Sequence, residues 1–103
     1  MAPPRPSGSE GKEPYFEWDA RKAAANRRKH GVSFDEAATV FADPNAGIKP
    51  DPDHSDEEAR ELILGMSASG RVLVVSFVER GLAIRIISSR PATRKERHAY
   101  EEN

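Results

Sequence analysis

The sequence predicts a single α+β domain, in which two helices come before an antiparallel sheet of three to four strands and one helix follows it. Two segments with the helical spacing of apolar residues come first, and segments rich in strand-forming residues follow them. A capping pattern near the end then opens the last helix. At 103 residues the chain is long enough for one domain and too short for two. We expect the first two helices to lie on one face of the sheet.

Residues 1–14 are expected to form a flexible tail. They contain four prolines and no large apolar side chain after Met1, so burial cannot offset the entropy lost on ordering them. The single domain is expected to cover residues 15–103. It begins with a short edge strand at residues 15–18, where three of the four residues are aromatic.

The first helix is predicted at residues 20–29. Asp19 is suited to cap its amino end, because a side-chain oxygen can accept from the first free amides of a helix. His30 supplies a favourable cation at the carboxyl end, and Gly31 supplies a residue that tolerates the left-handed conformation there.

The second helix is predicted at residues 34–41. Ser33 and Glu36 have the capping-box pattern, in which the serine hydroxyl accepts from the Glu36 amide and the glutamate reaches back to the Ser33 amide. Asp43 and Pro44 end the helix. Its apolar stripe is expected to face the core and consists of Phe34, Ala37, Ala38 and Phe41.

The second half of the chain predicts strands and one helix. A short strand is expected at residues 46–49, then a polar turn at 51–56 and a helical turn at 57–59. Strands at residues 60–66, 71–78 and 83–89 follow, joined by loops short enough for hairpins. Pro91 marks the break from the last strand, and Thr93 with Glu96 forms a capping box that opens a helix to about residue 102.

Charge is unevenly distributed along the chain, although the net charge is only −1. Residues 19–30 carry five Lys or Arg against one acid, and residues 85–103 carry five against three. Between them, residues 43–61 carry seven acids against two bases. If the two basic segments fold onto one face they form an anion site; the alternative is that they are ordinary solvated charges.

Several functional classes are excluded. The chain has no cysteine, so it can form neither a disulfide framework nor a cysteine metal site. It has no signal peptide and no apolar run long enough to cross a bilayer, so we expect a cytoplasmic protein. No glycine-rich phosphate loop, nucleophile elbow or zinc-ligand pair occurs. Phosphodiester cleavage remains, because it needs only a general base, cations beside the phosphate and an acid for the leaving oxygen.

Residues 51–56 contain side chains of the kinds that bind metals. His54 lies among Asp51, Asp53 and Asp56, but the segment lacks the glycine and the glutamate of a calcium loop. We expect neither a metal nor a cofactor.

Arg85 is unusual because it lies inside a predicted strand. Alternation places Ile84 and Ile86 on one face of that strand, and Arg85 and Ile87 on the other. A buried arginine must find an anion. One interpretation is an ion pair with Glu61 or Glu79 on a neighbouring strand; the other is that Arg85 lies on an open face and contacts phosphate.

A basic cluster surrounds the start of the last helix. Its members are Arg90, Arg94, Lys95, Arg97 and His98. A helix amino end also attracts phosphate, whereas the alternative is that these arginines only pair with Glu96 and Glu101. The residues near the cluster that can exchange a proton are Glu96, His98 and Tyr100; the last two have the alternatives of a surface position and core packing.

Three sets of strings resemble the BrnT family of toxins. They are FEWD (16–19) with AAAN (23–26) and KHGV (29–32); FDEAATVF (34–41) followed by DP (43–44); and RIISSR (85–90) with Arg97 and YE (100–101). The resemblance covers residues 15–102 in the right order. Two positions depart from the family's usual pattern: Pro91 stands where a second basic residue is common, and Phe77 stands where a histidine is frequent. We expect either change to weaken catalysis.

The resemblance implies a RelE-like toxin fold and a ribonuclease that cleaves RNA without a metal and so inhibits translation. It also implies neutralisation by a ribbon-helix-helix antitoxin of the BrnA type. The pair is expected as a 2:2 heterotetramer that represses its own operon, with the antitoxin contacting operator DNA.

Similar toxins hold the scissile phosphate with basic side chains of the sheet and the last helix. Matching this pattern residue by residue implies catalytic roles for Arg85, Arg90, Arg97 and Tyr100. RNA-binding roles fall to Arg94, Lys95 and His98. Two other classes of function stay open: a non-enzymatic toxin that binds a protein target such as a gyrase or ribosomal component, and an interaction module that binds only its antitoxin.

Overall fold

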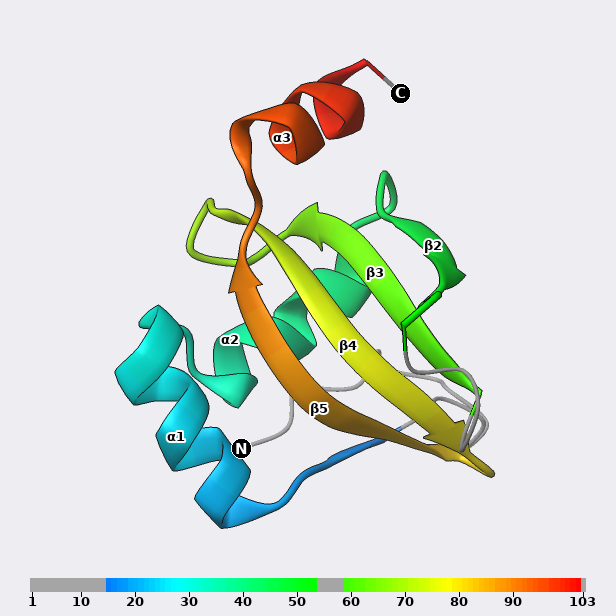
Figure 1. Cartoon of the computed structure of the whole chain (residues 1–103). Helices are drawn as coiled ribbons and strands as arrows, with labels where there is room; N and C mark the ends of the chain where they lie inside the picture. The colour runs from blue at the N-terminus through cyan, green and yellow to red at the C-terminus, as the bar shows by residue number, and fades with distance from the viewer. Residues whose placement is uncertain (1–14, 54–58, 103) are drawn as a thin grey trace.

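The computed structural model describes residues 15–53 and 59–102. Within them, a five-stranded sheet is combined with three α-helices and one short 3-10 helix (Figure 1). The order is β1 (Tyr15–Glu17), α1 (Ala20–His30), α2 (Phe34–Thr39), η1 (Val40–Ala42), β2 (Gly47–Pro50), β3 (Arg60–Met66), β4 (Val72–Arg80), β5 (Ala83–Pro91) and α3 (Arg94–Glu101). The predicted α+β class is confirmed. The predicted tail and most of the helical turn at 57–59 lie outside the described residues.

The sheet is mixed, whereas the sequence predicted an antiparallel one. The strand order is β1-β5-β4-β3-β2, and β2 to β5 form the predicted antiparallel meander. β1 is the expected edge strand, but it runs parallel to β5, with Tyr15 opposite Ala83. Three residues of edge strand carry no local signal for their partner or direction, so only the assembled sheet decides both.

Two element ends differ from the prediction. Helix α2 stops at Thr39, because its last turn tightens into the 3-10 helix η1. Strand β5 continues to Pro91, which pairs with Leu73, instead of breaking there. The next amide, of Ala92, donates to the Val72 carbonyl, so the proline nitrogen points to the strand edge and no ladder hydrogen bond is lost.

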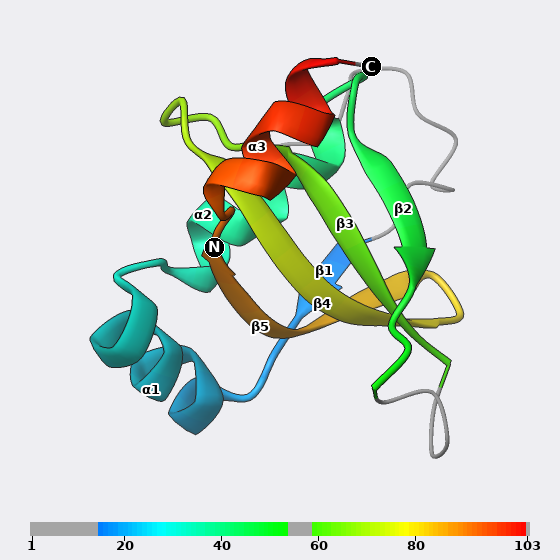
Figure 2. The same ribbon diagram turned by 45° about the horizontal axis from the view of Figure 1, so that its top comes forward.

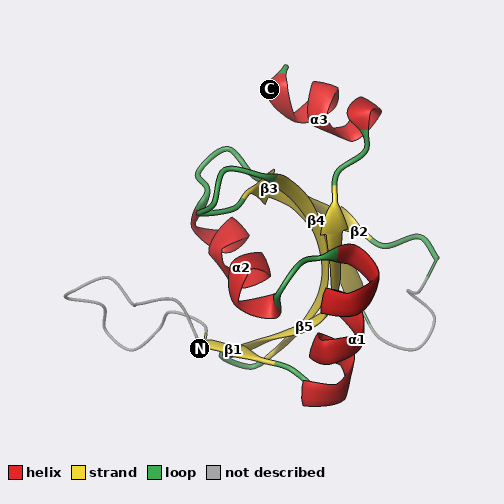
Figure 3. Cartoon of the chain, turned by 90° about the vertical axis from the view of Figure 1, so that its left-hand side faces the viewer, coloured by secondary structure: helices red, strands yellow, loops and turns green. Residues whose placement is uncertain are grey.

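The main core lies between α2 and the face of the sheet that we call the inner face. The predicted stripe of α2 is there, with Phe34, Ala37 and Ala38 buried and Phe41 half-buried. Phe41 meets Phe77 of β4 edge to face, with ring centroids 4.9 Å apart. Figure 3 shows the sheet curving around α2. Helix α1 lies alongside β5, and its Ala23 touches the edge of this core.

The opposite face of the sheet, which we call the outer face, is partly covered by α3. Val72 and Val74 of β4 form a small second core there with Ala92, Leu62, Leu64 and Tyr100. Figure 2 shows α3 crossing in front of the upper ends of β3 and β4. Within residues 15–53 and 59–102, no helix packs over the rest of the outer face, and the candidate site lies there.

Candidate functional site

Strand β5 contains a β-bulge at Ile87. Ser88 pairs with Ser76 of β4, and Ile86 pairs with Phe77, so Ile87 is an extra residue without a partner on β4. Strict alternation, on which Ile87 was expected to share a face with Arg85, is interrupted at this point.

The bulge brings Arg85 and Arg90 onto the same face. Five residues apart in a regular strand, they would point to opposite faces. In the structure Arg85 pairs with Val78 and Arg90 with Val74, and both valines are outer-face residues of β4. The four strand steps between these pairs separate the two arginines by about 13 Å along the sheet.

A hollow of about 290 Å³, which we call the sheet hollow, lies on the outer face. The described residues that line it are His30, Asp51, Asp53, Arg60, Leu62, Val74, Ser76, Ser88, Ser89 and Arg90. Its floor is therefore formed by β3, β4 and β5, its β5 side by the end of α1, and its far side by the segment after β2. Two guanidinium groups and two outer-face serine hydroxyls offer donors to an anion.

Arg90 is held in place by Glu96 of α3. Its Nη1 donates to Glu96 Oε1 at 2.8 Å and its Nη2 to Oε2 at 3.0 Å, the two-bond geometry in which a guanidinium meets a carboxylate. These bonds are the main reason that the pKa of Glu96 falls to about 2, and they raise the pKa of Arg90. A ligand that takes the same two N–H groups of Arg90 must therefore replace the Glu96 carboxylate.

Arg85 is not paired with either of the acids that the sequence predicted as partners. Its Nη1 lies 3.3 Å from Glu17 Oε2 of β1, not against Glu61 or Glu79. It is not among the described residues that line the sheet hollow. Glu17 reaches it because β1 pairs in parallel with β5, with Glu17 directly opposite Arg85.

Tyr100 lies apart from the two strand arginines. Its hydroxyl donates to Asp43 Oδ2 at 2.6 Å, which raises the tyrosine pKa. Asp43 also accepts from the amides of Met66 and Asn45, and these contacts lower its own pKa. Tyr100 thus fastens α3 to the start of the loop after η1.

The remaining predicted residues form the exposed side of α3. Arg94, Lys95, Arg97 and His98 are all exposed. His98 Nε2 lies 3.0 Å from Glu102 Oε2, one turn along the helix. Among residues 59–102, neither Arg94 nor Arg97 forms the predicted ion pair with Glu96 or Glu101.

Sequence reasoning missed Arg60 and His30, both of which line the sheet hollow. Arg60 could have been predicted from the sequence, because period-two alternation along the predicted strand at 60–66 places it on the same face as Leu62. His30 was not, because its position depends on how α1 packs along β5.

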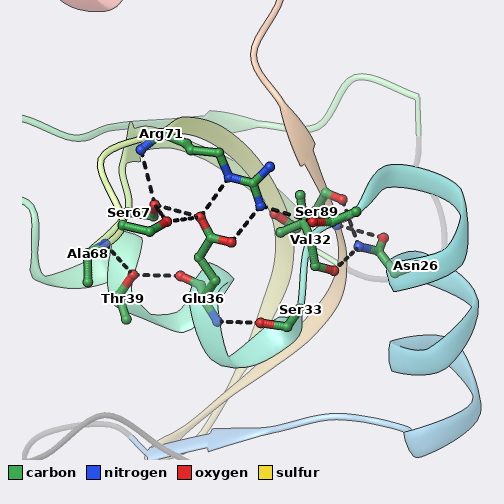
Figure 4. Close-up of polar contacts among 11 residues, drawn as sticks. Asn26, Val32, Ser33, Glu36, Thr39, Ser67, Ala68, Arg71 and Ser89 are labelled. Atoms are coloured by element: carbon green, nitrogen blue, oxygen red, sulfur yellow. Dashed lines mark hydrogen bonds and ion pairs between the residues drawn. The ribbon is translucent and has the colours of Figure 1, made fainter.

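Asn26 of α1 fixes the strand beside the hollow (Figure 4). Its amide accepts from the Ser89 N–H at 3.0 Å and donates to the Ser89 carbonyl at 2.8 Å and to the Val32 carbonyl at 3.0 Å. The Ser89 groups point to the edge of β5, so the buried asparagine takes the place of a neighbouring strand beyond the end of β1.

Glu36 and Arg71 join the hairpin between β3 and β4 to the helices. Arg71 donates to both Glu36 oxygens, at 2.6 and 3.0 Å, and to the Gly31 carbonyl at 3.0 Å. Arg71 is the main reason that the pKa of Glu36 falls to about 2, with Ser69 and Ser67 adding further hydrogen bonds. Glu36 therefore does not complete the capping box predicted with Ser33, although the Ser33 hydroxyl accepts from the Glu36 amide as expected.

The described part of the chain contains neither a cluster of metal ligands nor a membrane-spanning helix. No three His, Cys, Asp or Glu side chains within it lie together as metal ligands would. None of its helices has the length and apolar character needed to span a membrane.

Comparison with known proteins identifies the family. Residues 18–96 match the family model described as the ribonuclease toxin BrnT of type II toxin-antitoxin systems. The chain is also similar to the crystal structure of the Brucella abortus ribonuclease toxin BrnT, with a TM-score of 0.61 and 24% identity over 77% of this chain and 96% of that one. No curated protein sequence matches the chain. Because the family model spans more than half of the sequence, the chain belongs to the BrnT family of ribonuclease toxins of type II toxin-antitoxin systems.

Proposed function

We propose that the chain is an endoribonuclease that cleaves RNA without a metal and thereby inhibits translation. The observation that carries this proposal is the sheet hollow, where Arg60 and Arg90 lie with two serine hydroxyls on an open sheet face. Guanidinium groups recognise phosphate through paired hydrogen bonds, and hydroxyl groups add further donors. The family supports the reaction, because its model describes ribonuclease toxins.

In the proposed complex, the scissile phosphate replaces Glu96 on Arg90. The carboxylate already shows that the Arg90 guanidinium is oriented to bind a planar anion through two bonds. Arg85 is paired with Glu17 and does not line the hollow, so in this proposal it holds another phosphate of the same strand. The exposed cations of α3 extend the contact along the backbone, whereas the catalytic roles of Arg97 and Tyr100 stay predictions.

The test is cleavage of a long RNA by the full chain freed of antitoxin, in the presence of a chelator. Arg60→Ala and Arg90→Ala should each reduce the cleavage rate by about 100-fold, the effect of removing one donor from a transition-state anion site. Arg28→Ala is the matched control, since Arg28 is an exposed arginine of α1 that does not line the hollow. DNA of the same sequence should stay intact, because it lacks the 2′-hydroxyl nucleophile.

Two results would contradict the proposal. Undiminished cleavage by the Arg60→Ala, Arg90→Ala double variant would remove the site assignment. If a chelator abolished wild-type cleavage and a divalent cation restored it, the reaction would depend on a metal. Growth arrest on expression with cellular RNA intact would favour a protein target instead.

We also propose that a ribbon-helix-helix antitoxin of the BrnA type neutralises the chain in the cytoplasm, as a 2:2 heterotetramer that contacts operator DNA through the antitoxin. Membership in a type II family supports a protein antitoxin. Co-expression with the neighbouring reading frame, followed by light scattering and an operator-binding assay, tests the partner and the stoichiometry. A complex of another mass would overturn the 2:2 assembly.

A further inference from the structure

We propose that His30 is a catalytic residue of this ribonuclease, the general base that takes the proton from the ribose 2′-hydroxyl. The inference rests on the proposed function and names a residue that neither the family match nor the sequence analysis assigned to the reaction. It starts from one observation, that His30 lines the sheet hollow together with Arg90 and Arg60.

The position of His30 relative to Arg90 is fixed by the backbone of both elements. Asn26 lies one turn before His30, on the same side of α1, and its amide clamps the N–H and carbonyl of Ser89, the residue before Arg90. The turn after His30 is fixed as well, because the Gly31 carbonyl accepts from Arg71. His30 and Arg90 therefore extend from two elements that the Asn26–Ser89 contacts, shown in Figure 4, hold together.

Helix stability does not account for the placement of His30. A cation at the carboxyl end of a helix is favourable, but the last turn of α1 already carries Arg27, Arg28 and Lys29, all exposed. His30 is instead half-buried against the hollow, and within the described residues no hydrogen bond or ion pair joins its side chain to another group. Its ring nitrogens are thus available to a ligand.

The three groups expected to exchange a proton are occupied elsewhere. Glu96 accepts from the Thr93 amide, a bond that keeps its carboxylate at the start of α3 after the phosphate has replaced it on Arg90. Tyr100 donates to Asp43, and the exposed His98 is paired with Glu102 on α3. None of the three lines the sheet hollow. Of the side chains that do line it, an imidazole suits this task better than a carboxylate, because an efficient acid-base group titrates near the working pH.

The reaction balances with His30 as base and water as acid. The 2′-oxygen attacks phosphorus and its proton passes to a ring nitrogen of His30, while the bond from phosphorus to the 5′-oxygen breaks. The leaving 5′-oxygen takes a proton from water, and the imidazolium then gives its proton to the hydroxide that remains. The products are a 2′,3′-cyclic phosphate and a 5′-hydroxyl end. Arg90 stabilises the charge that develops on the phosphate oxygens.

The charged groups around His30 are of both signs. Arg60 and Arg90 line the hollow with it. Asp51 and Asp53 line the far side. The charges on its own helix and on the hairpin beside it are cationic: Arg27, Arg28, Lys29 and Arg71.

The experiment measures single-turnover cleavage of a transcribed RNA by the full chain between about pH 5 and 9, the range that brackets imidazole titration. Three variants are compared: His30→Ala, His30→Lys, which keeps the cation at the helix end, and Lys29→Ala as the control, because Lys29 is the exposed neighbour of His30 on α1 and does not line the hollow. We expect cleavage by both His30 variants to fall by about 100-fold or more, with RNA affinity changed by less than about threefold. The wild-type rate should fall with decreasing pH through imidazole protonation, and both His30 variants should lose this dependence.

Added imidazole separates a chemical role from a structural one. It should restore part of the cleavage by His30→Ala, whose missing ring leaves room for it, and should not restore cleavage by His30→Lys. Thermal unfolding checks that the variants are folded. If the wild type cleaves RNA, three results would each overturn the inference and leave the ribonuclease proposal standing. They are unchanged cleavage by His30→Ala, retained cleavage by His30→Lys, and no rescue of His30→Ala by imidazole. Absence of wild-type cleavage would overturn both.

Discussion

Replacing Asn26 by alanine tests the claim that one side chain stands in for a missing strand beside the site. The substitution removes three hydrogen bonds at once, two to the backbone of Ser89 and one to the carbonyl of Val32. All three backbone groups lose their partner in a region where Asn26 itself is only 7% exposed. Water therefore cannot fully replace the lost bonds.

The expected loss of stability is about 3 kcal/mol, from three bonds worth roughly 1 kcal/mol each, and more if the Ser89 groups stay dry. Against a typical total of about 5–15 kcal/mol this is a large change. Asn26→Asp should be no better at neutral pH, because it keeps the acceptor for the Ser89 amide but turns two donors into acceptors and buries a charge. Protonation at low pH should narrow its deficit.

The assay is urea unfolding followed by the fluorescence of Trp18, the single tryptophan, whose ring lies 5.9 Å from that of Phe34. The midpoint should fall by on the order of 2 M at an unchanged slope. Asn45→Ala is the control: its side chain is exposed, so the change should stay within about 0.5 kcal/mol. A loss below about 1 kcal/mol for Asn26→Ala would refute the reasoning.

Three further predictions use other contacts. Acid should destabilise the chain between about pH 4.5 and 2: the pKa of Glu36 is lowered from 4.5 to about 2 on folding, so its contribution is present above pH 4.5 and lost below it. This pKa shift corresponds to a stabilisation of about 3 kcal/mol, which solvent screening at the 42% exposed Arg71 reduces to about 1–2 kcal/mol. Glu36→Gln should flatten the pH dependence of the free energy of unfolding, measured by urea unfolding. Tyr100→Phe should cost about 1 kcal/mol and speed hydrogen exchange in α3, since it removes the bond to Asp43; equal exchange would exclude this fastening. Gly65→Ala should cost about 1–3 kcal/mol in thermal unfolding, because its new Cβ would lie 2.8 Å from Ala46 Cβ, whereas Gly47→Ala, with nothing within 4 Å, should be nearly neutral.

The helix caps illustrate how far local sequence reaches. Asp19, Ser33 and Thr93 each accept from the amides that the sequence predicted, because a cap involves residues within three positions of one another. The two capping boxes nevertheless diverge. Glu96 reaches back to the Thr93 amide, but Glu36 turns to Arg71, 35 residues further along. Only the folded hairpin brings a stronger partner to Glu36.

The candidate site was likewise predicted only in part from the sequence. The sequence predicted Arg85 inside a strand, with an open sheet face as one of two interpretations, and Arg90 beside the start of the last helix. The structure places both arginines on β5, on the outer face of the sheet. The sequence did not indicate that a bulge at Ile87 is required for this, because strict alternation separates the two. Nor did it reveal that Arg60 and His30 would lie with Arg90, while Tyr100 would not.

The sequence by itself therefore determined the class of fold, the order of the elements, their caps and the family, since these depend on short-range patterns and on matched strings. The tertiary structure decided which side chains meet. Asn26 and Ser89 are 63 residues apart, and Glu17 and Arg85 are 68 apart. Such pairs are selected by strand register, strand direction and helix packing, which minimise unpaired backbone groups and exposed apolar surface over the whole domain. No local pattern encodes them.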